Sequence, residues 1–250
     1  MLIAGFPAGP FGTNCWILSP GAGQEAVIVD PGMESTDGIA AVLAEHKLRA
    51  VAVLVSHGHI DHMFSVLPAC DGYDIPAWIH PFDRGLLTDP WAGMGADTKA
   101  MLTRALGEST FGEPSDVREL RDGSQVEIAG MRFIADHAPG HTPGSTSFVA
   151  AAAGPQSRGS RSGSAGEGAT TGVSPRVGDG ECCVFSGDTL FEGGPGATRW
   201  DYSSFEQIIG SIESRLFTLP DATVVHTGHG PSTSIGAERP HLDEWVRRGW

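Results

Sequence analysis

The chain has few cysteines, and their placement excludes the structures that cysteine-rich proteins use. Only four occur in 250 residues, namely Cys15, Cys70, Cys182 and Cys183. No two of them form a CxxC pair, the spacing typical of zinc ribbons and redox motifs, and the adjacent pair is poorly placed for an intrachain disulfide. We expect four reduced thiols, buried as small apolar groups, in a cytoplasmic protein.

Long apolar runs are also missing from the sequence. No run approaches the roughly 20 residues that a membrane span needs. The N-terminus has neither the basic start nor the long apolar stretch of a signal peptide. We therefore expect no membrane partner. With 250 residues, 40% of them hydrophobic, the chain is long enough to bury a substantial core.

Positive charge is scarce. The chain has 16 Lys and Arg residues against 30 Asp and Glu residues, which gives a formal net charge of -14. Phosphate binding needs clustered Lys and Arg, so this balance disfavours a nucleic-acid partner. Two bound divalent ions would raise the net charge by four, to about -10.

Potential metal ligands are most concentrated directly after an apolar run. Residues 50–55 predict a buried strand, and His57-Gly58-His59-Ile60-Asp61-His62 follows it. Side chains at i and i+2 of extended backbone point the same way, so His57 and His59 can bind one ion. Asp61 and His62 lie where the chain turns into a helix and can face a second ion. Imidazole and carboxylate suit zinc and its first-row neighbours.

Three further potential ligands each follow a predicted strand. His141, in Pro139-Gly140-His141-Thr142-Pro143, is the candidate for the third ligand that a catalytic zinc needs. Asp188 has two carboxylate oxygens and can bridge two ions, and His229 follows a later strand. Glycines flank most of these ligands and let the backbone approach the ions closely. The pattern predicts a metal-dependent hydrolase.

Strands and helices alternate in the way that predicts a sheet covered by helices. We predict strands over residues 2–6, 15–19, 26–30, 50–56, 77–80, 125–128, 131–136, 145–151, 181–186 and 222–226. We predict helices over residues 39–46, 63–70, 203–217 and 242–248. Residues 81–107 are predicted to be mainly helical, with a Gly/Pro interruption near residues 90–95. Residues 154–180 differ, because thirteen of these 27 residues are Gly or Ser. We expect a flexible insertion there, whose deletion leaves the fold intact.

The order of the motifs resembles the metallo-β-lactamase superfamily over almost the whole chain. The matching features are Asp30 after an apolar strand, HGHIDH, PGHTPGS, SGDTLF and TGHG. The resemblance implies an α/β fold, a four-layer αββα sandwich, as a single domain over residues 1–250. Within the superfamily, the chain is most similar to glyoxalase II-type (hydroxyacylglutathione hydrolase-like) thioester hydrolases. Because 21 residues follow His229, it resembles the short bacterial members, which have no C-terminal helical domain.

The resemblance also implies how the ligands divide. His57, His59 and His141 would bind the first ion, Asp61, His62 and His229 the second, and Asp188 would bridge them. The implied cofactors are two divalent ions, zinc first, with iron or manganese as alternatives. A hydroxide on the ions would attack a small-molecule thioester, with Asp61 and Asp188 as the catalytic carboxylates.

Several outer residues keep two interpretations. Arg199, in Ala197-Thr198-Arg199-Trp200-Asp201, would by resemblance contact an anionic group of the substrate. Asp30, Thr142 and Thr189 could support the ligands or could cap turns. Of the remaining histidines, we expect His46 and His241 to be exposed on helices, and His80, His137 and His226 to lie outside the site.

Two other reactions on the same scaffold stay open. A persulfide dioxygenase would use one iron held by His57, His59 and either Asp188 or His141, with the second set empty. A lactonase is the other alternative. A β-lactamase is disfavoured by Asp188, because β-lactamases of the superfamily normally lack this bridging residue. The native metal, the carrier thiol and the oligomeric state are not predicted.

Overall fold

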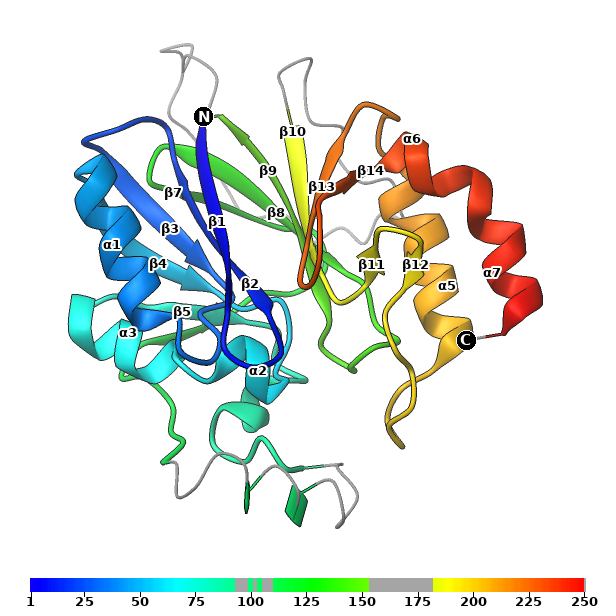
Figure 1. Cartoon of the computed structure of the whole chain (residues 1–250), viewed down its shortest axis with the longest axis horizontal. Helices are drawn as coiled ribbons and strands as arrows, with labels where there is room; N and C mark the ends of the chain where they lie inside the picture. The colour runs from blue at the N-terminus through cyan, green and yellow to red at the C-terminus, as the bar shows by residue number, and fades with distance from the viewer. Residues whose placement is uncertain (93–98, 101–102, 105–109, 153–181, 250) are drawn as a thin grey trace, which may run out of the picture.

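Two six-stranded sheets pack face to face in the computed structural model, which describes residues 1–92, 99–100, 103–104, 110–152 and 182–249 (Figure 1). The first sheet has the order β1 (Leu2–Ala8), β2 (Thr13–Ser19), β3 (Glu25–Val29), β4 (Arg49–Leu54), β5 (Ala77–Ile79) and β6 (Val117–Glu119). The second has the order β14 (Thr233–Ser234), β13 (Val224–Thr227), β10 (Cys182–Gly187), β9 (Thr146–Ala152), β8 (Met131–His137) and β7 (Ser124–Ile128). A small ribbon joins β11 (Leu190–Phe191) and β12 (Gly194–Pro195).

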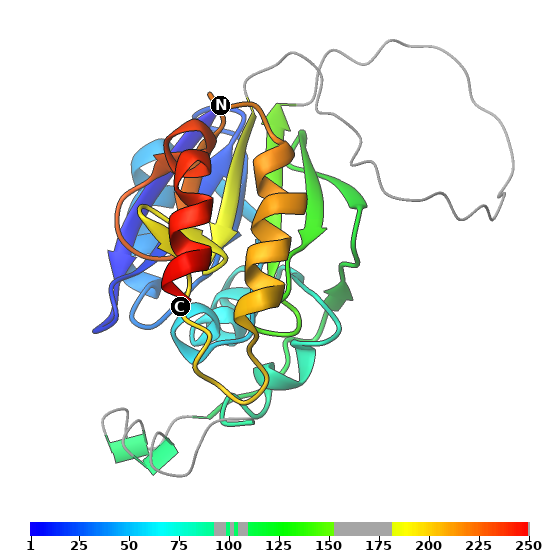
Figure 2. The same ribbon diagram turned by 90° about the vertical axis from the view of Figure 1, so that its right-hand side faces the viewer.

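Helices cover the outer face of each sheet. The α1 (Thr36–His46), α2 (Ile60–Met63) and α3 (Val66–Tyr73) helices lie on the side of the first sheet. The α5 (Phe205–Ser214), α6 (Ile235–Glu238) and α7 (Leu242–Arg248) helices lie on the side of the second (Figure 2). Short 3-10 turns are η1 (Arg84–Leu87), η2 (Leu216–Thr218) and η3 (Arg239–His241). The predicted αββα sandwich is therefore confirmed.

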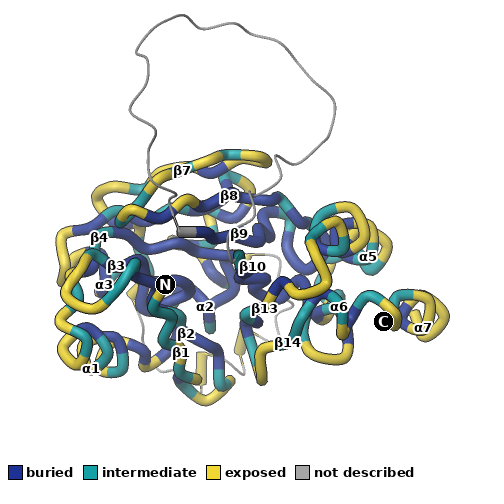
Figure 3. Tube along the Cα trace, turned by 90° about the horizontal axis from the view of Figure 1, so that it is seen from above, coloured by how far each residue is buried: buried dark blue, intermediate teal, exposed yellow. Residues whose placement is uncertain are grey.

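The strands are apolar on both faces, because each sheet packs against helices on one face and against the other sheet on the opposite face. In β3, Ala26 and Ile28 pack under the helices of the first sheet, whereas Val27 and Val29 pack between the two sheets. This alternation is the period-2 pattern of a strand buried on both sides. Figure 3 shows the result, with buried strands at the centre and exposed positions on the helices.

The helices begin and pack as their sequences indicate. The Ser204 side chain accepts a hydrogen bond from the Gln207 amide and caps α5. Ile208 and Ile212 then lie one turn apart and face the second sheet. In the part of the chain that the structure describes, no helix is long and apolar enough to span a membrane.

Some predicted elements differ from the structure. The helix predicted over residues 63–70 is two helices, α2 and α3, with a break at residues 64–65. In the stretch 81–107, turns occupy residues 90–92, where the interruption was expected. The helix expected before this interruption is wrong, because residues 81–83 and 88 are turns and only η1 lies between them, and several later residues lie outside the described ranges. The predicted 154–180 insertion also lies outside them and stays a prediction. The sequence analysis missed the short strands β6, β11, β12 and β14 and the helix α6.

The loops that carry the predicted ligands meet where the two sheets come together. The Asn14 amide donates to the Gly228 carbonyl, and an isolated bridge pairs Thr13 with His229. These contacts join β2 of the first sheet to the loop after β13 of the second. A groove of about 490 Å³, lined by Trp78, Arg118 and Ile128 among others, lies at the opposite ends of the strands and does not contribute to this region.

Candidate metal centre

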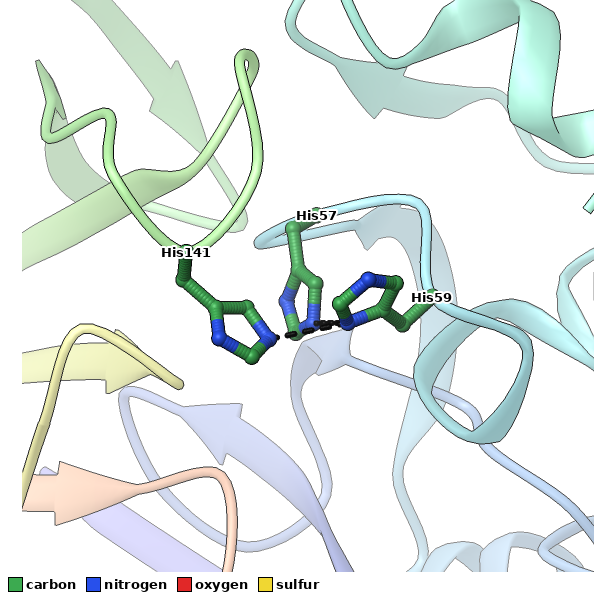
Figure 4. A group of neighbouring side chains, drawn as sticks. All are labelled: His57, His59 and His141. Atoms are coloured by element: carbon green, nitrogen blue, oxygen red, sulfur yellow. Dashed lines mark hydrogen bonds between the residues drawn. The ribbon is translucent and has the colours of Figure 1, made fainter. Parts of the chain in front are cut away.

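The structure brings all seven predicted ligands together, although they come from four separate segments that each follow a strand. The first cluster follows β4, His141 follows β8, Asp188 follows β10 and His229 follows β13. Figure 4 shows His57, His59 and His141 with their rings converging. Three overlapping groups of these side chains place their ligand atoms within 4.8 Å of one another, close enough to hold metal ions.

The first group consists of three buried histidines. The His59 Nδ1 atom lies 3.1 Å from His57 Nε2 and 2.8 Å from His141 Nε2. The three side chains follow strands of two different sheets, β4 and β8. The residues are 1%, 4% and 1% exposed in chain order. Three inward-facing imidazole nitrogens form the kind of ligand set that catalytic zinc sites use.

The second group contains a carboxylate and is more open. The His229 Nε2 atom lies 3.1 Å from Asp61 Oδ2 and 3.2 Å from His62 Nε2. Asp188 lies between the groups, with Oδ1 3.1 Å from His62 Nε2 and Oδ2 3.5 Å from His141 Nε2. One carboxylate therefore reaches ligands of both groups, as a bridging residue must.

The chemistry of these side chains fits divalent ions. Asp188 Oδ1 is buried and has no hydrogen-bond partner among the described residues, since its approach to His62 Nε2 is close but not directed as a hydrogen bond. A buried carboxylate oxygen without a hydrogen bond is costly unless a cation neutralises it. Imidazole nitrogens that face one another at hydrogen-bonding distance likewise need a proton or a metal between them.

The electrostatics differ between the two groups. Burial lowers the pKa of His57, His59 and His141, and neighbouring imidazoles lower that of His57 further. Neutral imidazole is the form that ligates a metal. Burial acts against a charged His62, but the Asp188 and Asp61 carboxylates outweigh it and raise its pKa well above the usual value. The carboxylates thus create a negative potential at the second group that favours bound positive charge.

Asp30 supports two ligands from behind. Its carboxylate accepts hydrogen bonds from the Ser56 amide at 2.7 Å and the Ser56 hydroxyl at 2.6 Å, and lies 3.0 Å from His62 Nδ1. A proton held on Nδ1 leaves His62 Nε2 free to face the centre. Asp30 has a φ of 50°, a strained conformation for a residue with a side chain, of the kind that clusters at functional sites. Of its two interpretations, ligand support is the one that these contacts favour.

Asp83 joins the two loops that carry the first group, and the sequence analysis missed it. Its carboxylate accepts from the Gly58 amide at 2.9 Å, the Gly144 amide at 2.7 Å and the Thr142 hydroxyl at 2.6 Å. Thr142 therefore acts through Asp83, whereas the buried Thr189 hydroxyl has no hydrogen-bond partner among the described residues. An aspartate before a short helical turn looks like a cap, so no local signal marks it.

Two glycines allow the backbone to approach the centre. A Cβ atom on Gly228 would overlap Asp188 Oδ1 and lie 2.7 Å from His62 Cε1. Gly187 has a φ of 50°, and a Cβ atom there would overlap the Ser56 side chain. Any side chain at either position would displace a ligand or its support.

An aromatic wall borders the first group, and the sequence analysis missed part of it. The Trp200 ring lies 4.4 Å from the His59 ring, and the Tyr202 hydroxyl lies 2.8 Å from His59 Nε2. Burial, followed by the Asp83 charge, raises the pKa of Tyr202, so its phenol stays neutral. Arg199 is exposed and places its guanidinium over the Trp200 ring at 5.2 Å. The aromatic pattern around Arg199 was the available signal.

The other histidines lie apart from the seven predicted ligands. His241 is exposed and His46 is half-buried at the end of α1. The His80 ring stacks on His137 at 4.1 Å, and His226 packs against Trp16 and Phe185. Three of the four cysteines are buried, Cys182 is half-buried, and all four are free thiols as expected.

Comparison with known proteins agrees with this geometry. The model of the metallo-beta-lactamase superfamily matches residues 8–153. An uncharacterised protein of Mycobacterium leprae is 42% identical over 240 residues, with 96% of each chain covered. The chain belongs to the metallo-beta-lactamase superfamily.

Other relatives are more distant. The hydroxyacylglutathione hydrolase GloC of Haemophilus influenzae is 26% identical over 93% of this chain and 92% of its own. Among solved structures, the BLEG-1 B3 metallo-beta-lactamase gives a TM-score of 0.74 at 29% identity, covering 96% of this chain and 98% of its own. TTHA1623, solved in a di-iron-bound form, gives 0.68 at 29% identity, covering 94% and 96%. Members of this superfamily are generally hydrolytic enzymes, and the clustered His and Asp ligands indicate a two-metal site.

Proposed function

We propose that the protein is a two-metal hydrolase that cleaves a thioester. The observation that carries the proposal is Asp188, whose buried carboxylate lies between two complete ligand groups and has an oxygen without a hydrogen bond. In the proposed centre, His57, His59 and His141 would hold one ion, Asp61, His62 and His229 would hold the other, and Asp188 would contact both.

Two divalent ions held by these residues would supply a hydroxide nucleophile at neutral pH and would polarise the substrate carbonyl. The protein side chains keep this chemistry oriented. Thr13 donates a hydrogen bond of 2.8 Å to Asp61 Oδ2, which orients that carboxylate toward His229. Asp30 and Ser56 hold the rings of His62 and His57 from the far side. Asp61 and Asp188 supply the negative charge that stabilises the two cations.

The exposed side of the centre is where the substrate would enter. His229 and Asp61 have side chains that are 27% and 17% exposed, whereas His62 is fully buried. Phe191 lies 5.9 Å from His229 on this side, and Trp200 lines the His59 side. Arg199, exposed above Trp200, is placed to attract an anionic group on the substrate.

Two considerations favour a thioester over other acyl substrates. The related GloC is named a hydroxyacylglutathione hydrolase, and such a substrate is a thioester. A thiol leaves with a pKa near 8.5, so it needs less protonation by the enzyme than an amine does. The proposed reaction therefore requires no separate acid at the leaving group. This agrees with the site, where Asp61 and Asp188 would both face the ions.

The completeness of the second group favours hydrolysis over the mononuclear dioxygenase. Asp61, His62 and His229 converge as closely as the first group does, whereas a one-iron enzyme would leave this set without a role. β-Lactam hydrolysis is the second candidate, because BLEG-1 resembles this chain over nearly the full length of both. Asp188 favours the thioester hydrolase over this candidate, since β-lactamases of the superfamily normally lack the bridging residue.

The decisive experiment combines metal analysis with substrate comparison. The purified protein, loaded in turn with zinc, iron and manganese, is assayed against S-lactoyl esters of several thiols, a lactone, a chromogenic cephalosporin and a persulfide. We expect two ions per chain and fastest hydrolysis of a thioester. Faster cephalosporin cleavage, or one iron per chain with oxygen consumption on the persulfide, would contradict the proposal. An Asp71→Ala variant serves as the control, because Asp71 is an exposed residue of α3.

A further inference from the structure

One segment holds both histidines at the outer side of the first group. Residues 197–203 connect β12 to α5. The Ala197 carbonyl accepts from His141 Nδ1 at 2.7 Å, and the Ser203 hydroxyl donates to the His141 carbonyl at 2.8 Å. From the same segment, the Tyr202 hydroxyl reaches His59 Nε2 at 2.8 Å.

The tautomer of His59 depends on the contact between its Nε2 atom and the Tyr202 hydroxyl. His59 faces the other two histidines through Nδ1, which lies 3.1 Å from His57 Nε2 and 2.8 Å from His141 Nε2. A neutral imidazole carries one proton, so a ligating Nδ1 requires the proton on Nε2. That N–H then donates to the Tyr202 oxygen. The opposite tautomer would direct an N–H into the centre in place of a lone pair.

The aromatic wall holds the Tyr202 hydroxyl in place. The Trp200 and Tyr202 rings are nearly parallel, with centroids 6.4 Å apart and an interplanar angle of 6°. Trp200 also contacts the rings of both His59 and His141, at 4.4 Å and 5.0 Å. The hydroxyl therefore accepts the His59 hydrogen bond from a fixed position, and little rotational freedom is lost when it forms.

The second group receives its support from elsewhere in the chain. His62 Nδ1 faces Asp30, Asp61 accepts from Thr13, and His229 Nδ1 lies 3.2 Å from the Phe11 carbonyl. Among the contacts of the described residues, none of these partners belongs to residues 197–203. Asp30 contacts both groups, directly at His62 and through Ser56 at His57. The contacts from residues 197–203 reach only the first group, so a change in this segment should alter one ion.

We propose that Tyr202 is a positioning residue for the first group alone, fixing His59 in the tautomer that presents Nδ1 to a divalent ion. The inference rests on the metal centre in the proposed function, but not on the substrate. Tyr202→Phe retains the aromatic ring and loses only the hydroxyl. The inference predicts that this variant binds one of the two ions about 10–100-fold more weakly. The affinity for the other ion stays unchanged.

The test is a zinc titration against a competing chelator with the full chain. Tyr73→Phe is the matched control, because Tyr73 is the only other tyrosine and is 38% exposed at the end of α3. Nitrogen NMR of the zinc-loaded protein gives a second readout, since it distinguishes a proton on His59 Nε2 from one on Nδ1. The melting temperatures of both variants report whether the fold is intact.

The outcomes separate this inference from the proposed function. Selective weakening of one ion in Tyr202→Phe, with the Nε2-protonated tautomer in the wild type, supports the inference. Two unchanged affinities, equal loss of both ions, or an Nδ1-protonated His59 would overturn it, even if thioester hydrolysis is established. A wild-type chain that binds fewer than two ions would overturn both proposals. Failure to hydrolyse any thioester would overturn the proposed substrate and leave this inference standing.

Discussion

The two ligand groups of the centre differ in depth and in charge. His57, His59 and His141 are buried and neutral, and their outer partners are a carbonyl, two hydroxyls and an aromatic ring. The second group combines His62 and His229 with Asp61, and its His229 side chain is 27% exposed. A deep neutral group beside an open acidic one suggests a division of labour. In the proposed centre, the first group would hold its ion more firmly, and the second would expose its ion to water and substrate.

The largest effect is expected where the two groups meet. Asp188→Ala should remove both ions and lower hydrolysis by about a thousandfold or more, equivalent to about 4 kcal/mol of transition-state stabilisation. The cause is that one carboxylate contacts ligands of both groups. Metal content by mass spectrometry and kcat/KM against a thioester measure this, with Asp71→Ala as control. Full activity in a metal-free Asp188→Ala protein would refute the two-ion mechanism.

The second prediction separates the groups by deleting one ligand from each. His229→Ala should retain one ion, because the buried first group is complete without it. His141→Ala should lose the ion that the first group binds, and it should also lose its activity. Titration with a chelator should show that the second-group ion leaves the wild type first. Loss of the same ion in both variants would remove the proposed distinction.

The third prediction concerns the support of the first group. Asp83→Ala leaves the Gly58 amide, the Gly144 amide and the Thr142 hydroxyl without their shared acceptor. We expect a loss of about 3 kcal/mol in the free energy of unfolding, measured by urea denaturation. Asp83→Asn, which keeps one oxygen acceptor, should lose less. Equal stability of Asp83→Ala and the wild type would show that the two loops are held by other contacts.

Prediction from the sequence was most successful where the functional residues lie close together or at regular positions after strands. The i and i+2 histidines after a buried strand, and ligands placed after later strands, were enough to predict the seven side chains that converge. The αββα fold was predicted from the resemblance to the metallo-β-lactamase superfamily. Asp83 and Tyr202 could not be predicted in the same way, because each acts on a loop distant in sequence. Asp83 is 61 residues from Gly144, and Tyr202 is 143 residues from His59. Their neighbours in sequence indicate only a turn and an aromatic stretch.

The short elements were missed for a related reason. The strands β6 and β14 have three and two residues, too few for an alternating pattern to appear. They form because neighbouring strands offer paired backbone groups, which is tertiary information. In residues 81–107, the interruption predicted around Pro90 is present as turns at 90–92, but the helix predicted before it is only the 3-10 turn η1.

The smallest effect is expected at a histidine outside both groups. Burial lowers the pKa of His226 from 6.5 to about 4. The unfolded chain therefore takes up this proton before the folded protein does. Its contribution to stability is full above pH 6.5 and is lost as the pH falls toward 4. His226 is only half-buried, so the loss should be less than about 1 kcal/mol.

A His226→Phe variant tests this, because phenylalanine preserves the packing against Trp16 and Phe185. Its urea-unfolding free energy should fall less between pH 6.5 and 4.5 than that of the wild type. The lost Ser232 hydrogen bond shifts both values by a constant amount and does not alter the slope. Identical pH slopes would mean that His226 titrates alike in the folded and unfolded states.

Anomalous diffraction from zinc-loaded crystals, collected at the zinc absorption edge, tests the two-ion centre most directly. The account predicts two peaks, one about 2.0–2.1 Å from nitrogens of His57, His59 and His141 and one beside Asp61, His62 and His229. Asp188 should place an oxygen about 2.0–2.2 Å from each peak. A single peak, or an Asp188 carboxylate that contacts neither ion, would contradict the account.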